Sequence, residues 1–251
     1  MISLGNYWGK KYNDLYLFFK KYVPLKIKEN ISLKNWSECG EFLNDPEMYL
    51  QPGFIPSKND VIYDIGSQFA DYAIYWAIKY HARVYAFEGL SDNYIKAVKN
   101  IESNFSNMNN RPIFNDIKMF NLFVGNDSRI SYEVKGNMAA VGLRTMGQSQ
   151  SVALDSFVID SGILLPDIIK IDVEGYEYQV LQGAMNLINT HRPKIILEVH
   201  SKDLLFECHK FLTGLGYKIA AQGRVIYNNR IPGRVNCWMD RVQNLFYLPK
   251  D

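Results

Sequence analysis

Short apolar segments alternate with longer amphipathic segments from Val61 onward. Apolar runs of about four to eight residues are typical of buried strands, whereas apolar positions spaced three and four apart are typical of helices. The pattern predicts strands at 61–66, 83–88, 117–125, 167–173, 194–199, 217–221 and 244–249. It predicts helices at about 71–81, 91–104, 176–190 and 202–215. Strands that alternate with helices indicate an α/β fold with a largely parallel sheet.

Residues 126–152 interrupt this alternation. They are rich in Gly, Ser, Asn and Gln, and only residues 130–134 show a short alternation of apolar and polar side chains. We expect a hairpin and a mobile loop here, and such a loop could cover a site.

The first part of the chain differs from the rest, and we expect an N-terminal arm, partly helical and partly irregular, at residues 1–55 and one domain at 56–251. An apolar stripe with helical spacing lies in this arm, at Leu15, Phe18, Phe19 and Tyr22. Docking of this stripe on the protein's own core is the favoured interpretation. Contact with a membrane surface or with another subunit stays open, because basic amphipathic helices of these kinds resemble one another.

The composition is that of an ordinary globular protein. Of 251 residues, 47% are hydrophobic and 22% are charged, which excludes disordered and fibrous classes. Lys and Arg number 28 against 26 Asp and Glu, a balance that argues against a dedicated nucleic-acid-binding protein. Oligomeric state is not indicated.

Three widely spaced cysteines, with no CxxC pair, suggest neither a disulfide framework nor a cysteine zinc site. No other metal site is expected. The longest apolar run near the start, Leu15 to Phe19, is too short for a signal peptide or a membrane span. We therefore expect no transmembrane segment and a cytoplasmic location.

The first candidate site follows the first strand, at Asp64, Gly66, Ser67 and Gln68. A tight turn there would direct backbone N–H groups and a helix N-terminus at a ligand. Glu88 ends the second strand, where a carboxylate can accept hydrogen bonds from both hydroxyls of a ribose. A plain turn and a surface glutamate remain the alternative.

The second candidate site combines Asp172 and Glu174, after one strand, with His200, after the next. The carboxyl ends of these strands meet at the edge where open α/β folds bind ligands. If the strand continues through both acids, they share a face. His200 is the nearby side chain that titrates near neutral pH, so acid–base chemistry is available. Helix capping by one of the acids, and a histidine that only begins a loop, are the alternatives.

Five stretches carry a resemblance to a known family. They are VIYDIGSQFADYAIYWA, VYAFEGLSDNYIKAVKNIESN, VALDSFV, PDIIKIDVEGYEYQVLQGA and IILEVH, in this order. This set resembles the FkbM family of S-adenosylmethionine-dependent methyltransferases, and KIDVEGYEYQVLQGA is its most specific part. The resemblance implies a Rossmann-like seven-stranded methyltransferase sheet with helices on both faces and an antiparallel last strand. It also implies S-adenosylmethionine as the cofactor.

The resemblance assigns roles to individual positions. Asp64 and Gly66, with Ser67 and Gln68 after them, match the loop beside the methionine part of the cofactor. Glu88 matches the acid that holds the ribose, and Phe123 and Val124 fall where such folds line the adenine pocket. Asp172 matches the acid beside the methyl donor, and Glu174, Glu198 and His200 match positions around the acceptor.

Two departures from the family pattern concern the cofactor. The family's first loop usually reads D-[V/I]-G-A-N-x-G, and this chain has Ser67, Gln68 and Ala70 in place of Ala, Asn and the second Gly. If that position has a positive φ, Ala costs about 1 kcal/mol and its methyl could crowd the cofactor. Gln68 keeps an amide that can replace the Asn contact. Gly89 stands where the family commonly has Pro, which loosens that turn.

These observations lead to the hypothesis of an O-methyltransferase. The acceptor is expected to be a hydroxyl on a small molecule or glycan, which includes glycolipids and secondary metabolites, with His200 and Asp172 as candidate bases and Glu174 beside them. An N-methyltransferase and a non-catalytic S-adenosylmethionine-binding or interaction module with an altered first loop remain alternatives. A nicotinamide oxidoreductase is disfavoured by the missing glycines and by the KIDVEG motif.

Overall fold

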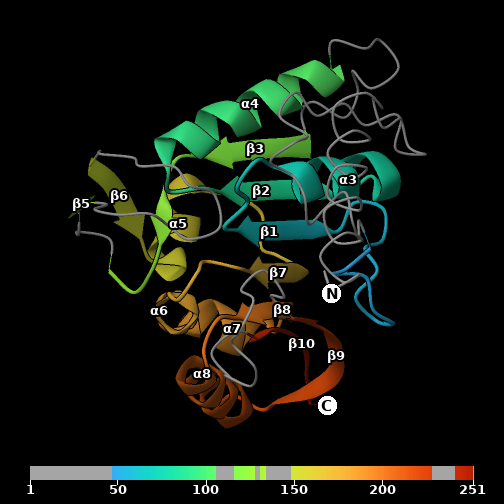
Figure 1. Cartoon of the computed structure of the whole chain (residues 1–251), viewed down its shortest axis with the longest axis vertical. Coiled ribbons are helices and arrows are strands. Elements are labelled where there is room, and N and C mark those ends of the chain that lie inside the picture. Colours follow the sequence, from blue (N-terminus) through green and yellow to red (C-terminus); the bar gives the residue numbers. More distant parts are fainter. Residues whose placement is uncertain (1–46, 106–115, 128–130, 134–147, 228–240, 251) are drawn as a thin grey trace, which may run out of the picture.

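A computed structural model describes residues 47–105, 116–127, 131–133, 148–227 and 241–250. Seven strands form one sheet in the order β3-β2-β1-β7-β8-β10-β9 (Figure 1). They are β1 (Val61–Ile65), β2 (Arg83–Phe87), β3 (Ile117–Phe120), β7 (Ile168–Ile171), β8 (Lys194–Val199), β9 (Tyr217–Tyr227) and β10 (Arg241–Pro249). The first five strands of this order pair in parallel, and β10 runs antiparallel to both β8 and β9. The expected seven-stranded sheet with an antiparallel last strand is confirmed.

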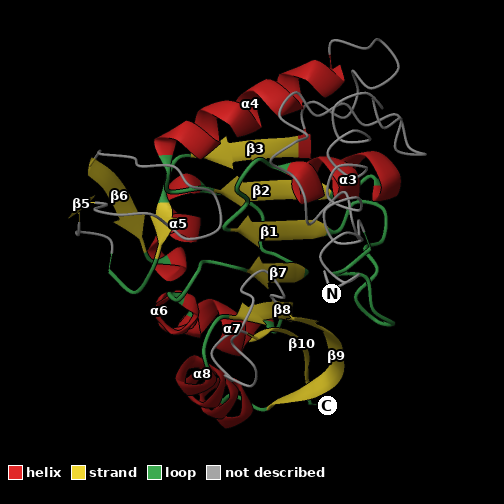
Figure 2. Cartoon of the chain, viewed as in Figure 1, coloured by secondary structure: helices red, strands yellow, loops and turns green. Residues whose placement is uncertain are grey.

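Helices cover both faces of this sheet (Figure 2). Helices α3 (Asp71–Tyr80) and α4 (Ser91–Phe105) pack on one face. Helices α5 (Leu154–Ser161), α6 (Glu177–Gly183), α7 (Met185–His191) and α8 (Lys202–Gly214) pack on the other. The two layers bury the apolar faces of the strands, as expected of an α/β fold.

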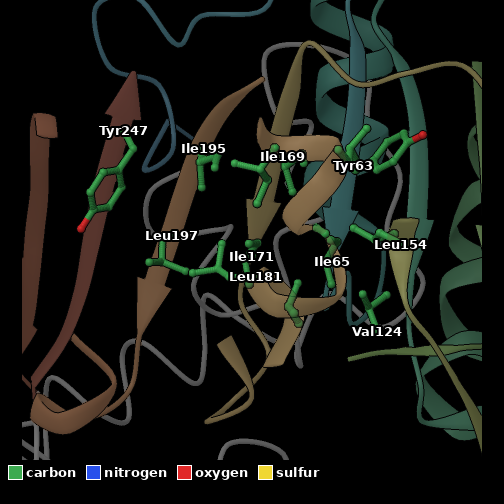
Figure 3. Close-up of a cluster of buried hydrophobic side chains, with 14 of the residues drawn as sticks. Tyr63, Ile65, Val124, Leu154, Ile169, Ile171, Leu181, Ile195, Leu197 and Tyr247 are labelled. Atoms are coloured by element: carbon green, nitrogen blue, oxygen red, sulfur yellow. The ribbon is translucent and has the colours of Figure 1, made fainter. Parts of the chain in front are cut away.

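Strand alternation divides the core into two clusters. In β1, β2, β7, β8 and β10, even-numbered side chains such as Ile62, Ile168 and Phe246 lie on the side of the sheet that α3 and α4 cover. The odd-numbered side chains of these strands face the other four helices, and Figure 3 shows Ile65, Ile171 and Leu197 beside Leu181 of α6. Successive side chains of a strand point to opposite faces, so the sequence pattern fixes which residues share a face.

A second, three-stranded sheet has the order β4-β6-β5. Its strands are β4 (Phe123–Val124), β5 (Ser131–Glu133) and β6 (Gln148–Val152). In Figure 1 it lies on the side to which the arrows of β1, β2 and β3 point. Strands β5 and β6 pair antiparallel, which confirms the expected hairpin, and the expected mobile loop falls on residues 134–147, outside the described part.

The single strand expected at 117–125 is wrong, because β3 ends at Phe120 and β4 belongs to the second sheet. The side-chain amide of Asn121 donates to the backbone carbonyl of Glu88, 2.9 Å away, and to that of Gly89 at 3.3 Å. A side chain that bonds to the end of the neighbouring strand in this way competes with continued pairing of the backbone.

The single helix expected at 176–190 is also wrong, because α6 ends at Gly183 and α7 begins at Met185. Gly183 packs directly on another segment, since a Cβ added there would lie 1.8 Å from the carbonyl oxygen of Gly125. Helix α5 was not expected at all, and β9 and β10 are longer than expected.

The described end of the N-terminal segment packs into the core. Tyr49 and Phe54 are 1% and 0% exposed, and Phe54 contacts Phe246 of β10 with ring centroids 5.1 Å apart. The helix expected at Leu15 to Tyr22 lies outside the described residues. Among those residues, the structure contains no helix with the length and hydropathy needed to cross a membrane.

Candidate active site

Charged side chains gather at the carboxyl ends of β1, β7 and β8, on the face that α3 and α4 cover. The ammonium group of Lys170, 3% exposed, lies 3.2 Å from Asp64 Oδ1 and 3.4 Å from Asp172 Oδ2. It also donates to the backbone carbonyl of Gly66 at 2.9 Å. Burial alone would lower the pKa of Lys170, but the charges of Asp64, Asp172 and Glu198 outweigh it and raise the pKa. Lys170 is therefore a fixed cation beneath the site.

Asp64 is the partner of this lysine and is 1% exposed. Burial raises the pKa of Asp64, and the neighbouring Lys170 opposes that rise. The structure thus places Asp64 below the loop after β1. Its contact there is an ion pair that joins the ends of β1 and β7.

Tyr49, which precedes the first strand, contacts two acids of this cluster. Its hydroxyl donates to Glu198 Oε2 at 2.6 Å, and it lies 3.3 Å from Asp172 Oδ2. Glu198 is 3% exposed and precedes His200 by two residues. One phenol group therefore contacts both Glu198, which the resemblance assigns to the acceptor region, and Asp172, which it assigns to the methyl donor.

His200 is held by a second buried carboxylate. Its Nδ1 lies 2.6 Å from Oε1 of Glu177, which is 0% exposed, and its Nε2 lies 3.6 Å from Asp172 Oδ1 and 3.5 Å from Glu174 Oε2. The carboxylate can only accept, so Nδ1–H donates to Glu177 and Nε2 points toward the two other acids. Burial favours the neutral imidazole, but the hydrogen bond to Glu177 and the charges of Asp172 and Glu174 raise the pKa of His200 to about 9. This histidine is oriented and strongly basic.

The turn between β7 and α6 brings Asp172 and Glu174 to this histidine. The strand ends at Ile171, and Glu174 has a φ of 51°, so the expected shared face on an extended segment is wrong. Both acids nevertheless reach Nε2 of His200. Capping of α6 by either acid is also wrong, because the residue at its N-cap is Tyr176 and no side chain caps it.

The loop after β1 lies tightly against the end of β7. Gly66 has a φ of 79°, and a Cβ added there would lie 1.7 Å from the carbonyl oxygen of Asp172. Only glycine fits this approach. The expectation that the N–H groups of this loop point at a ligand is wrong for three residues: Gly66 and Ser67 donate to Phe87 O, and Gln68 donates to Glu88 Oε2. The loop instead organises the end of β2.

Glu88 lies at that end, and both of its oxygens accept backbone hydrogen bonds. Gln68 N donates to Oε2 at 2.9 Å and Leu90 N donates to Oε1 at 2.8 Å. Burial raises the pKa of Glu88 to about 7, against the lowering effect of these N–H groups. The ring of Phe123 packs on the next residue, since a Cβ on Gly89 would lie 2.2 Å from it. An acid beside an aromatic ring is the arrangement expected for a nucleoside, and it explains glycine at position 89.

Two other residues predicted to bind the cofactor, Ser67 and Val124, are buried. The Ser67 hydroxyl faces Met119 Sδ at 3.7 Å, and Val124 is buried in the apolar cluster of α5 to α8. Ala70 has a φ of 59°, is 0% exposed and packs in the cluster below α3 and α4. Its methyl therefore contributes to the core.

Replacing Ala70 with glycine tests whether the methyl group of Ala70 packs in the core. Relief of the left-handed backbone is worth about 1 kcal/mol, and loss of a buried methyl costs about 0.8 kcal/mol. We expect the free energy of unfolding to change by less than about 1 kcal/mol. His81→Gly is the matched control, since His81 has a φ of 55° but is exposed, and it should stabilise the protein. Urea denaturation measures the free energy of unfolding of both variants. A decrease above about 2 kcal/mol in Ala70→Gly would contradict the expected cancellation of the two effects.

Metal binding was not expected, although three side chains of the site lie close enough together to share a metal ion. Single ligating atoms of Asp172, Glu198 and His200 lie within 4.8 Å of one another. A cation among them would compete with the Tyr49 hydroxyl for Glu198 and with Lys170 for Asp172. The arrangement suits hydrogen bonding and proton transfer better than metal coordination.

Sequence reasoning did not single out Tyr49, Lys170 or Glu177. Lys170 and Glu177 are the first and last charged residues of KIDVEGYE, so the motif contained their signal. Tyr49 had no signal, because its contact to Glu198 spans 149 positions.

Among the known proteins and structures that this chain resembles, three matches bear on its family. The model of the methyltransferase FkbM domain matches residues 60–219. The hexuronic acid methyltransferase AglP of Haloferax volcanii is 26% identical over 149 residues, which are 57% of this chain and 57% of AglP. The crystal structure of methyltransferase FkbM from Methylobacillus flagellatus superimposes with a TM-score of 0.56 at 18% identity, over 79% of this chain and 47% of that one. The chain thus spans about half the length of these two relatives.

Proposed function

Since the chain belongs to the FkbM methyltransferase family, whose model covers more than half of it, we propose that it transfers a methyl group from S-adenosylmethionine to a hydroxyl. The acceptor is a glycan, a glycolipid or a secondary metabolite. The observation that carries the choice of a hydroxyl is the pair formed by His200 and the buried carboxylate of Glu177. A hydroxyl is a weak nucleophile at neutral pH and needs a base, whereas a neutral amine needs only orientation.

The residues along the edge of the sheet fit the cofactor. Glu88 keeps accepting capacity beyond its two backbone contacts and its hydrogen bond with the Asn93 side chain, because each carboxylate oxygen has two lone pairs. It can therefore accept from ribose hydroxyls, with Phe123 beside it for the adenine. Gly66 lets the loop after β1 lie against the backbone of Asp172, so these two positions, both assigned to the methyl donor, are neighbours. When bound, S-adenosylmethionine supplies an electrophilic methyl group on a sulfonium.

The side chains around His200 fit the acceptor. Glu177 holds the Nδ1–H tautomer, so Nε2 is the atom that takes the proton of the acceptor hydroxyl. Asp172 and Glu174 lie within 3.6 Å of Nε2 and stabilise the imidazolium that results. These fixed groups would also orient the acceptor hydroxyl, and orientation of the reacting atoms supplies much of the acceleration in such a transfer.

The proposed acceptor class has support from a relative. AglP is a hexuronic acid methyltransferase, and a sugar presents hydroxyls of the kind that this site can deprotonate.

The test is methyl transfer by the purified full chain from S-adenosylmethionine that carries a deuterated methyl group. Acceptors should include free sugars, glycosides, uronic acids and matched amino sugars, with mass spectrometry of the products. We expect a label on oxygen. A label on nitrogen alone would establish an N-methyltransferase, and cofactor binding without transfer to any acceptor would favour the interaction module.

A further inference from the structure

Tyr49 lies outside the stretch that the family model matches, yet its hydroxyl reaches the acids of the site. It donates to Glu198 Oε2 at 2.6 Å and lies 3.3 Å from Asp172 Oδ2. The matched stretch begins at residue 60. A segment upstream of the family domain therefore contributes directly to the acceptor side.

The ring of Tyr49 is fixed by packing. It is 1% exposed and contacts Tyr72 and Trp76 of α3, with ring centroids 4.7 and 6.3 Å away. The ammonium of Lys170 lies 5.5 Å from the ring centroid. The backbone turns at this point, where Leu50 N donates to Glu47 O at 2.8 Å. The hydroxyl is thus held in place before any ligand binds.

A phenol has one proton, and the shorter distance assigns it to Glu198. Burial raises the pKa of Tyr49 well above its ordinary value, and the charges of Glu198 and Asp172 and the neighbouring Tyr72 raise it further. The hydroxyl therefore stays a donor across the working pH range.

Asp172 is oriented by Lys170 and lies beside the hydroxyl that Glu198 holds. Its Oδ2 faces Tyr49 and the ammonium of Lys170, 3.3 and 3.4 Å away, and its Oδ1 lies 3.6 Å from Nε2 of His200. Removing the hydroxyl would leave two neighbouring carboxylates with one donor fewer. Their repulsion would turn Asp172 away from His200.

We propose that Tyr49 is a positioning residue for methyl transfer, which keeps Glu198 and Asp172 oriented toward His200 and the acceptor. This inference rests on the proposed function. Tyr49 acts through the two carboxylates that its hydroxyl contacts.

Tyr49→Phe is the test, because phenylalanine keeps the packed ring and removes only the hydroxyl. We expect kcat to fall by about 10- to 100-fold, the loss typical of a hydrogen bond to a charged group. The Kd for S-adenosylmethionine should stay within about threefold of the wild type. The matched control is Tyr63→Phe, which removes a buried hydroxyl that donates to Leu164 O on the opposite face of the sheet, and kcat should not change.

A double-mutant cycle with Glu198→Leu tests whether Tyr49 influences kcat through Glu198. If Tyr49 acts through Glu198, Tyr49→Phe causes little further loss in the Glu198→Leu background. An additive loss would overturn this route, and an unchanged kcat in Tyr49→Phe would overturn the proposal.

A measurement without turnover separates this inference from the proposed function. The ¹⁵N chemical shifts of the His200 imidazole should change in Tyr49→Phe and not in Tyr63→Phe. Unchanged shifts would contradict the positioning role, even if the wild-type protein transferred no methyl group to any acceptor. Absence of transfer together with changed shifts would count against the proposed function alone.

Discussion

His200→Gln is expected to lower kcat by about 10²- to 10⁴-fold, the usual contribution of a general base. Glutamine keeps a side chain that can donate to Glu177, but its amide cannot take a proton near neutral pH. The Kd for S-adenosylmethionine should change little, because Gly66 and Glu88 follow other strands, β1 and β2. Steady-state kinetics with a hydroxylated acceptor, together with cofactor titration, measures the two effects separately.

His209→Gln serves as the control for this experiment. His209 lies on α8, its Nδ1 is 3.1 Å from the Tyr247 hydroxyl, and it has no part in the site. A His200→Gln variant that turns over as fast as this control would remove His200 as the base.

The pH dependence of kcat also tests whether His200 is the base, because it predicts the direction in which the rate changes with pH. The active base is the neutral imidazole, and the pKa of His200 is raised to about 9, chiefly by Glu177 and the nearby acids against the effect of burial. The rate should therefore rise with pH and level off at about pH 9. In Glu177→Gln the plateau should begin nearer the ordinary histidine value of about 6.5. A rate that falls over this range would mean that protonated His200 is the working form.

Gly66→Ala is expected to cost roughly 2–5 kcal/mol of unfolding free energy and to abolish cofactor binding. The new methyl would lie 1.7 Å from the carbonyl oxygen of Asp172, on a backbone with a φ of 79°. The ends of β1 and β7 would have to separate, and both carry groups of the site. Urea denaturation and cofactor titration measure the two effects.

Gly162→Ala isolates the backbone part of this cost. Gly162 follows α5 with a φ of 62°, and a Cβ there would meet nothing within 4 Å. This control should lose only about 1 kcal/mol. Equal losses in the two variants would show that the contact between β1 and β7 is less tight than the structure indicates.

The fold was largely predictable because strand and helix periodicities are local. The seven main strands, and α3, α4 and α8, begin close to the expected positions, since each carries its own apolar pattern. The breaks after Phe120 and after Gly183 were not predictable. They depend on Asn121 reaching the end of β2 and on Gly183 meeting Gly125, which are contacts between distant segments.

The site was predictable only in part, for the same reason. The carboxyl-edge rule grouped Asp172, Glu174 and His200 correctly, although the strand geometry used for the two acids was wrong. The internal use of the loop N–H groups could not be inferred, because their acceptors belong to Phe87 and Glu88 on another strand. Tyr49 required the tertiary structure, since only packing on α3 brings it to Glu198.

Isothermal titration of the full chain with S-adenosylmethionine and S-adenosylhomocysteine tests the central claim most directly. The protein should bind both compounds, and Glu88→Ala should weaken both by about tenfold or more, the loss of at least one hydrogen bond to a charged group. Glu88→Gln keeps one accepting oxygen and should have an intermediate effect. If the folded wild-type protein binds neither compound, or if Glu88→Ala binds both as tightly as the wild type, the assignment of this edge of the sheet to the methyl donor is contradicted.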